Sequence, residues 1–142
     1  MRQPSPTTTD GTLLSLRFIY ASLALAIVLY VLVMKLTPPK TAVPINPLIP
    51  LVLGFVAATN LGAGQTIRSR KIPPAFDTLR AKPDDLASLT QWRTGAMISA
   101  CLAESVALFG VVVYFLGGRV IQVAPFLVGG LAALIFWWPK RP

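Results

Sequence analysis

The chain has 142 residues, of which 54% are hydrophobic and only 13% are charged, and its mean hydropathy is +0.67. A soluble domain of this length could not bury so much apolar side chain, which excludes that class and indicates an integral membrane protein. The net charge of +8 is accompanied by no histidine and by one cysteine. A disulfide within the chain and a histidine-based metal or acid–base centre are therefore excluded as well.

Four segments reach the roughly 20 mainly apolar residues that are needed to cross the hydrocarbon core of a bilayer. These spans are predicted at residues 18–36, 48–67, 94–117 and 120–138. Residues 1–11 are polar and are predicted to form a disordered tail, which is followed by a single four-helix domain over 12–142. Proline and glycine mark the joints between spans, and the longest joint, 68–93, is predicted to be a basic loop. The sequence thus predicts an all-α membrane protein with four transmembrane helices.

The basic residues are divided unevenly between the two sides of the predicted membrane domain. Ten of the 13 fall at the two termini or in the 68–93 loop, and the other three are Lys35, Lys40 and Arg119. Because cytoplasmic segments carry an excess of Lys and Arg, both termini and this loop are predicted to be cytoplasmic, in a multi-pass protein of the bacterial inner membrane. The positive charge is interpreted as a topology signal that also contacts anionic headgroups of membrane lipids, and no nucleic acid partner is expected.

Glu104 is the only glutamate in the chain, and it lies inside the third apolar span. A carboxylate in hydrocarbon costs several kcal/mol unless it is neutralised, paired or hydrated, so Glu104 is a candidate functional residue. It would be either an ion or proton site or a neutral carboxyl group that is hydrogen-bonded across a helix interface. Asn60, on the second span, is expected at a similar depth and is its candidate partner. Asn60 and Gln65 also suit simple interhelical hydrogen bonds.

Small side chains recur at helical spacing on two of the spans, where they would permit close helix contact. On the second span this stripe contains Gly54, Ala58 and Gly62, with Ala57, Gly64 and Gln65 on the same side. On the third span it contains Ala96, Ser99, Ala100, Ala103, Ala107 and Gly110. These two helices are therefore predicted to pack against each other or against copies of themselves.

Two sequence stretches, "LGAGQTI" at 61–67 and "ACLAESVALFGVVVYFL" at 100–116, carry a resemblance to a known family. Over residues 54–116 the chain resembles the hairpin of the proteolipid c subunits of rotary ATP synthases. In that family a glycine-rich helix packs on a second helix that carries the ion-binding carboxylate. The resemblance implies that Glu104 carries H⁺ or Na⁺, with Gln65 and Ser105 as ligands, in an oligomeric ion-translocating complex.

No nucleotide-binding loop, nucleophile motif or acidic cluster occurs in the sequence, so an enzyme is not expected. Two functions remain open. The first is a non-enzymatic subunit or scaffold of a membrane assembly, in which Glu104 is a buried carboxylate at a helix interface. The second is an H⁺- or Na⁺-carrying component of the c-subunit kind. Both require a homo-oligomer or a larger membrane complex, and the lack of a second ionisable group deep in the spans favours the scaffold.

Overall fold

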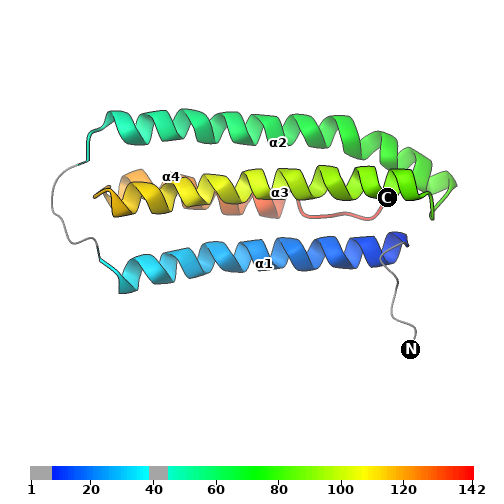
Figure 1. The fold of residues 1–142 in the computed structure, drawn as a ribbon, viewed down its shortest axis with the longest axis horizontal. Helices are drawn as coiled ribbons and strands as arrows, with labels where there is room; N and C mark the ends of the chain where they lie inside the picture. The colour runs from blue at the N-terminus through cyan, green and yellow to red at the C-terminus, as the bar shows by residue number, and fades with distance from the viewer. Residues whose placement is uncertain (1–7, 39–44) are drawn as a thin grey trace.

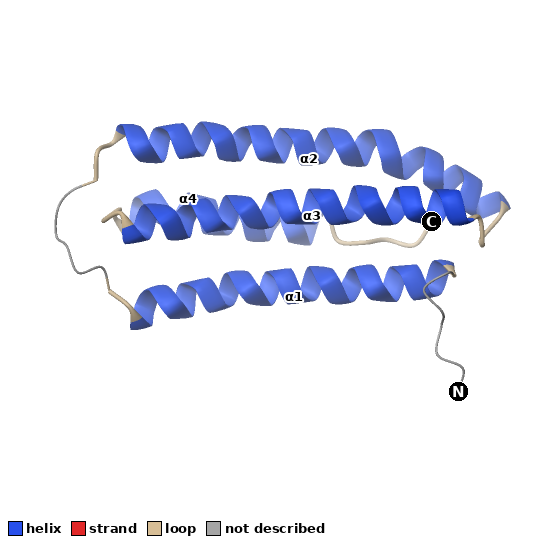
Figure 2. Ribbon diagram, in the orientation of Figure 1, coloured by secondary structure: helices blue, strands red, loops and turns tan. Residues whose placement is uncertain are grey.

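A computed structural model describes residues 8–38 and 45–142, and this part of the chain forms four helices and no strand (Figures 1 and 2). The helices are α1 (Thr9–Leu36), α2 (Leu48–Ala81), α3 (Leu86–Phe115) and α4 (Val120–Phe136). The first three are long and apolar enough to cross a membrane, whereas α4 has only 17 residues. The described part of the chain is therefore all-helical in its regular structure, and its three long apolar helices suggest a membrane protein.

The third helix, α3, is the centre of the bundle. In Figure 2 it lies between α1 and α2, with α4 behind it, and it packs against all three other helices. Such close packing is possible because one face of α3 carries small side chains, all of them buried: Ala96, Ser99, Ala100, Ala103, Ala107 and Gly110. The face predicted from the spacing of small residues is thus the face on which the bundle is assembled.

On α2 the small residues are arranged differently from the prediction. Ala57 and Gly64 are buried, Gly54 is half-buried, and both Ala58 and Gly62 are exposed. A Cβ added at Gly62 would meet nothing within 4 Å. The stripe of Gly54, Ala58 and Gly62 is therefore turned away from α3 along most of its length, although α2 and α3 do pack against each other. Small residues occur on two neighbouring faces of α2, and spacing alone does not say which face meets α3.

The predicted basic loop at 68–93 is helical along most of its length. α2 runs on to Ala81, α3 begins at Leu86, and only a short turn joins them. Pro73 and Pro74 lie inside α2 and remove two backbone donors, and the helix bends near this end (Figure 1). The prediction failed because proline was taken as the end of a helix, whereas here it kinks a helix that tertiary contacts hold in place.

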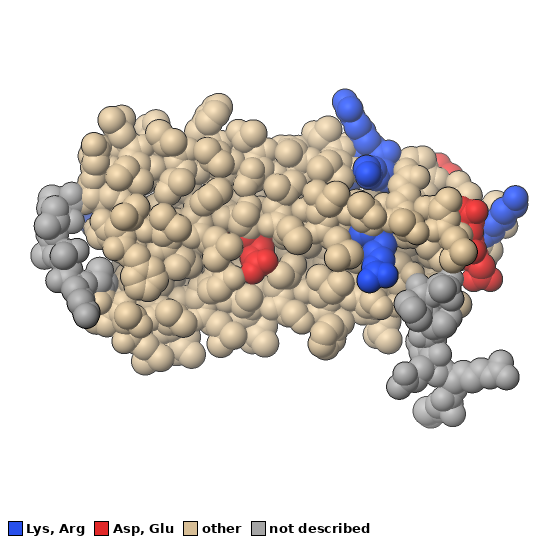
Figure 3. Space-filling view, in the orientation of Figure 1, with Lys and Arg blue, Asp and Glu red and all other residues tan. Residues whose placement is uncertain are grey.

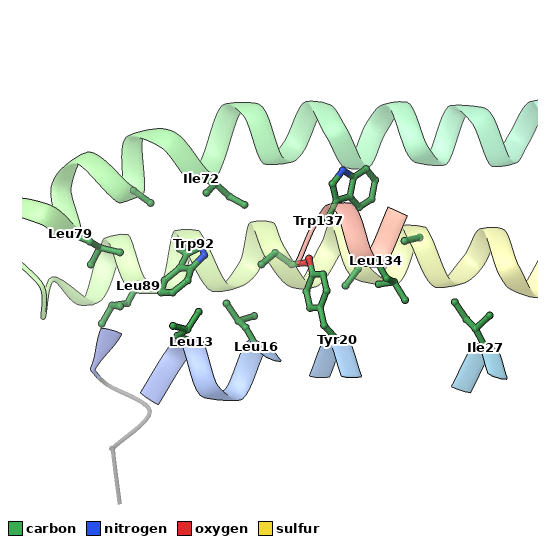
Figure 4. Close-up of a cluster of buried hydrophobic side chains, with 14 of the residues drawn as sticks. Leu13, Leu16, Tyr20, Ile27, Ile72, Leu79, Leu89, Trp92, Leu134 and Trp137 are labelled. Carbon is green, nitrogen blue, oxygen red and sulfur yellow. The ribbon is translucent and has the colours of Figure 1, made fainter. Parts of the chain in front are cut away.

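Those contacts belong to a hydrophobic cluster, part of which lies at the end of the bundle beyond α4 (Figure 4). Ile72 and Leu79 from α2 meet Leu89 and Trp92 from the first turns of α3, and the Trp92 ring packs edge-on against Phe76 at 5.4 Å between ring centres. From α1, Leu13 and Leu16 close the cluster. Residues near the start of α1 are thus part of the packed core.

The start of α1 is defined by a helix cap. The side chain of Thr8 accepts a hydrogen bond of 3.2 Å from the backbone N–H of Gly11, and α1 begins at Thr9, nine residues before the predicted span. Residues 1–7 of the predicted tail lie outside the described residues. The end of α1 at Leu36 and the starts of α2 and α4 agree with the predicted spans.

The termini of the described chain and the turn between α2 and α3 lie at the same end of the bundle (Figure 1). The Thr9 hydroxyl donates a hydrogen bond of 2.5 Å to the Pro83 carbonyl, and Arg141 forms an ion pair with Asp10. On the face drawn in Figure 3, Lys and Arg side chains gather toward this end. The charge asymmetry in the sequence is therefore an asymmetry between the two ends of the bundle; Lys40 lies outside the described residues.

Candidate functional site

Glu104 lies in the middle of α3 and bonds to α1. The Tyr30 hydroxyl donates a hydrogen bond of 2.7 Å to Glu104 Oε1, which joins two residues 74 positions apart in the chain. Figure 3 shows one acidic group in the middle of a face on which the other charged side chains lie toward the ends, and the four aspartates all lie near helix ends. The Glu104 side chain is only half-buried, so the description of this group as a buried carboxylate needs correction. Its position between α1 and α3 leaves one side open to the surroundings.

The next residue along α3, Ser105, bonds to α2 in the same layer of the bundle. Asn60 Nδ2 donates a hydrogen bond of 2.9 Å to Ser105 Oγ, and this hydroxyl in turn donates to the Leu102 carbonyl at 2.7 Å. Asn60 is therefore bonded to the neighbour of Glu104 and not to Glu104 itself. Together the two bonds tie α1 and α2 to adjacent residues of the central helix, and hydrogen bonds of this kind are worth about 0.5 to 2 kcal/mol each within a membrane.

Gln65 takes part in a different contact. Its Oε1 accepts a hydrogen bond of 3.0 Å from Trp137 Nε1, at the end of α4. The indole ring can approach because the neighbouring residue is Gly64, where an added Cβ would lie 2.6 Å from Trp137 Cη2. The three residues implied as ion ligands therefore have three separate partners: Glu104 bonds to Tyr30, Ser105 to Asn60, and Gln65 to Trp137.

A second polar layer, nearer the basic end, involves residues that the sequence analysis did not select. Arg68 donates a hydrogen bond of 3.1 Å to the Tyr20 hydroxyl, which itself donates to the Ala96 carbonyl at 2.9 Å. The Arg68 guanidinium also lies over the Trp137 ring, 5.9 Å from its centre. Figure 4 shows Tyr20 pointing from α1 toward α3, and Trp137 lying between the end of α4 and α2.

This layer joins all four helices, since Tyr20 comes from α1, Arg68 from α2, Ala96 from α3 and Trp137 from the end of α4. One signal could have found it. A tyrosine inside an apolar span usually needs a hydrogen-bond partner for its hydroxyl, and α1 contains two, Tyr20 and Tyr30. Each of them bonds to α3 in the folded chain.

The chemistry available to these groups is mainly that of hydrogen bonding. In residues 8–38 and 45–142, no group of three or more His, Cys, Asp or Glu could hold a metal ion, and no buried polar side-chain atom lacks a partner. Cys101 is an exposed free thiol on α3. Among the described residues, Glu104 is the one carboxyl group in the middle of the bundle, and it faces outward in part.

Comparison of the chain with models of protein families, with curated proteins and with solved structures finds no match.

The contact between Gly64 and Trp137 leads to a first prediction. Gly64→Ala should destabilise the folded chain by about 1 to 2 kcal/mol, because the added methyl group must displace the indole ring and stretch its bond to Gln65. Gly62→Ala is the matched control, since its methyl group would enter open space on the same helix. Thermal unfolding of both variants in detergent, followed by tryptophan fluorescence, should show a lower midpoint for Gly64→Ala alone. Equal midpoints would contradict the close contact.

Proposed function

We propose that the chain is a non-enzymatic subunit or scaffold of a membrane assembly, in which Glu104 holds a helix interface. The observation that carries the proposal is the 2.7 Å hydrogen bond from the Tyr30 hydroxyl to Glu104 Oε1, between α1 and α3. The adjacent bond from Asn60 to Ser105 supports it, because the two contacts fix α1 and α2 on either side of one turn of α3. A carboxyl group with such a partner can serve solely to hold two helices together through a hydrogen bond.

The outer surface of the bundle supports association with further helices. The exposed stripe of Ala58 and Gly62 on α2 would let another helix backbone approach closely, and it is flanked by exposed large apolar residues such as Leu51 and Phe55. Within membrane lipid, a second copy of the chain or a helix of a larger complex could pack on this stripe. We therefore propose a homo-oligomer or a subunit of a larger complex.

The test of assembly is the mass of the full-length protein extracted in mild detergent, measured by size-exclusion chromatography with light scattering. The native chain is expected to be larger than a monomer, and the double variant Ala58→Leu/Gly62→Leu should reduce self-association about tenfold or more, because leucine prevents close approach. Ala63→Leu is the matched control, since Ala63 is also exposed on α2 but lies about 100° away from the stripe. A strictly monomeric native chain, with no partner retained on extraction, would contradict the proposal.

The orientation of the bundle is proposed from its charge. The basic end, with both termini and the turn between α2 and α3, would lie in the cytoplasm of a bacterium, with the apolar helices in its inner membrane. A cysteine placed at Thr78, which is exposed on α2 near this turn, should be protected from an impermeant thiol reagent in intact spheroplasts and should react after lysis. Cys101→Ser provides the background without a native thiol. Labelling of the Thr78 site in intact spheroplasts would contradict this orientation and indicate the opposite one.

A second candidate function is that of an H⁺- or Na⁺-carrying component of an oligomeric ion-translocating complex. The observation that favours it is the half-exposed position of Glu104 on an apolar face, where a neighbouring subunit could complete or open the site. Tyr30 would then be the resting partner of the carboxyl group. Gln65 would have to leave Trp137 before it could act as a ligand, which makes a proton a simpler cargo than Na⁺.

A further inference from the structure

An open hollow of about 590 Å³ lies beside the point where α4 ends. It exists because α4 stops at Phe136, whereas α2 continues past this level to Ala81. One wall is formed by Arg68, Ser69 and Ile72 of α2, and the other by Phe136, Trp138 and Lys140. The hollow thus combines cationic, hydroxyl and aromatic side chains at the edge of the apolar bundle.

The hollow has a positive charge that the described chain does not balance. Arg68 is half-buried, and its two close partners, Tyr20 and Trp137, are both uncharged. Among residues 8–38 and 45–142, the ion pairs are those of Arg80 with Asp77 and of Arg141 with Asp10, so neither Arg68 nor Lys140 has an acidic partner there. Because a guanidinium removed from water is costly unless it is compensated, an anion in the hollow would stabilise this arrangement.

The shape of the hollow indicates what kind of anion it accepts. Next to the cationic groups, Ile135 is 63% exposed and Phe136 is 78% exposed, and both belong to the apolar surface of the bundle. Trp138 is also partly exposed, as is typical of tryptophans at the depth of lipid headgroups. A ligand that fits both parts has an anionic head and an apolar tail. Arginine and a serine hydroxyl are suited to phosphate oxygens.

We propose that this hollow is a binding site for an anionic phospholipid. Its phosphate lies between Arg68 and Lys140, and its acyl chains lie along Ile135 and Phe136. The Ser69 hydroxyl, which donates to the Thr66 carbonyl at 3.0 Å in the folded chain, turns to the phosphate as a further donor. This site differs from a general attraction of anionic lipid to the basic end of the bundle, because the preference for anionic over zwitterionic lipid depends on particular side chains. The lipid site is expected whether Glu104 holds an interface or carries an ion. Its test is therefore independent of the test of the proposed function.

The site can be tested by fluorescence quenching of the full-length protein in mixed micelles with brominated lipids. Trp137 and Trp138 line the hollow, whereas Trp92 is only 1% exposed in the cluster beyond α4, so quenching by bound lipid reports mainly on the hollow. Brominated phosphatidylglycerol should quench at a lower mole fraction than brominated phosphatidylcholine. In Arg68→Gln/Lys140→Gln this preference should fall about tenfold or more, given the contribution of each basic residue to headgroup binding.

The matched control is Arg70→Gln/Lys82→Gln, which removes the same charge from exposed positions of the same end that do not line the hollow. The control should keep the preference for phosphatidylglycerol. An equal loss of this preference in the control would mean that the lipid is attracted by the net charge of this end alone, and it would overturn the proposal. Since Arg68 also holds Tyr20, the milder variant Ser69→Ala/Lys140→Gln is measured as well. This variant should keep the native melting temperature, and its preference for phosphatidylglycerol should fall about threefold. Full preference in this variant would overturn the site.

Two further arms decide the source of the phosphate. Inorganic phosphate or glycerol 3-phosphate, added in excess to the micelles, should leave the quenching by phosphatidylglycerol unchanged, because neither molecule has an acyl chain for the apolar wall. If either displaces the lipid at low concentration, the site belongs to a soluble phosphate compound and the lipid proposal is overturned. Equal quenching by the two brominated lipids would overturn it too.

Discussion

Gly130→Ala is expected to force α4 away from α3 and to destabilise the folded chain by about 2 to 3 kcal/mol. A Cβ at this position would lie 2.7 Å from the Ala103 carbonyl oxygen and 3.1 Å from the Ala107 backbone nitrogen. Both atoms belong to the backbone of the central helix, so they cannot rotate away as the end of a side chain can. Thermal unfolding in detergent should show a midpoint lowered well below that of the native chain.

Gly129→Ala is the control, because it adds the same methyl group one residue earlier on α4. There the nearest atom is Val106 Cγ1 at 3.9 Å, which is an ordinary van der Waals contact. This variant should be as stable as the native chain, or slightly more stable because alanine has the higher helix propensity. Gly130 is buried against α3. Equal losses of stability at both positions would contradict this close approach of α4 to α3.

The parts of the fold that could be predicted from the sequence are those set by local apolar pattern. α1 ends at Leu36, and α2 and α4 start at Leu48 and Val120, where a polar, proline or glycine segment meets an apolar run. The tight turn before α4 could also be predicted from the glycines at 117 and 118, and in the folded chain Gly117 has a φ of 93°, which favours glycine. At these boundaries local chemistry and the folded chain agree.

Where tertiary contacts decide, local pattern misled the prediction. The segment 68–93 has prolines and charges typical of a loop, yet Ile72, Leu79 and Trp92 are buried in a cluster that keeps it helical. The spacing of small residues did not determine which face of α2 meets α3 either. Ala57 and Ala58 are one position apart, and only the rotation of the whole helix buries the first and exposes the second.

The candidate site shows the same division. Glu104 could be selected because a carboxylate in an apolar span is rare and costly. Its partner Tyr30 lies 74 positions away on a helix whose register against α3 is set by packing, so no spacing in the sequence indicated the pair. Likewise, Gln65 was selected by resemblance as an ion ligand, but the close approach of Trp137 at Gly64 provides it with a different partner.

Substitutions of Glu104 are expected to separate its two proposed roles. The Tyr30 hydroxyl donates to Glu104 Oε1, and the carbonyl oxygen of a glutamine could accept the same bond. Glu104→Gln should therefore keep the contact between α1 and α3 and the native oligomeric state. Glu104→Leu removes the acceptor and should weaken folding or assembly by about 0.5 to 2 kcal/mol. Unfolding midpoints and light scattering of the two variants measure this difference.

The partner residue gives the control for this contact. Tyr30→Phe removes the donor, so its loss of stability should resemble that of Glu104→Leu. The two losses should not add in the double variant Tyr30→Phe/Glu104→Leu, because each single change already breaks the same bond. Fully additive losses would mean that the hydrogen bond does not hold the interface, and the scaffold role of Glu104 would then lose its structural basis.

Glu104→Gln also decides between scaffold and carrier, because a glutamine can hold the bond to Tyr30 but cannot release a proton or offer a negative charge to a cation. If the chain is a scaffold, the assembly that contains the Gln variant should work at the native rate. If Glu104 carries H⁺ or Na⁺, vesicles with this variant should show a normal assembly but no ion flux. Dicyclohexylcarbodiimide, which reacts with a neutral carboxyl group in an apolar setting, should then modify the native chain and leave the variant unmodified. Full flux through the Gln variant would exclude the carrier and leave the hydrogen bond to Tyr30 as the reason for a glutamate at this position.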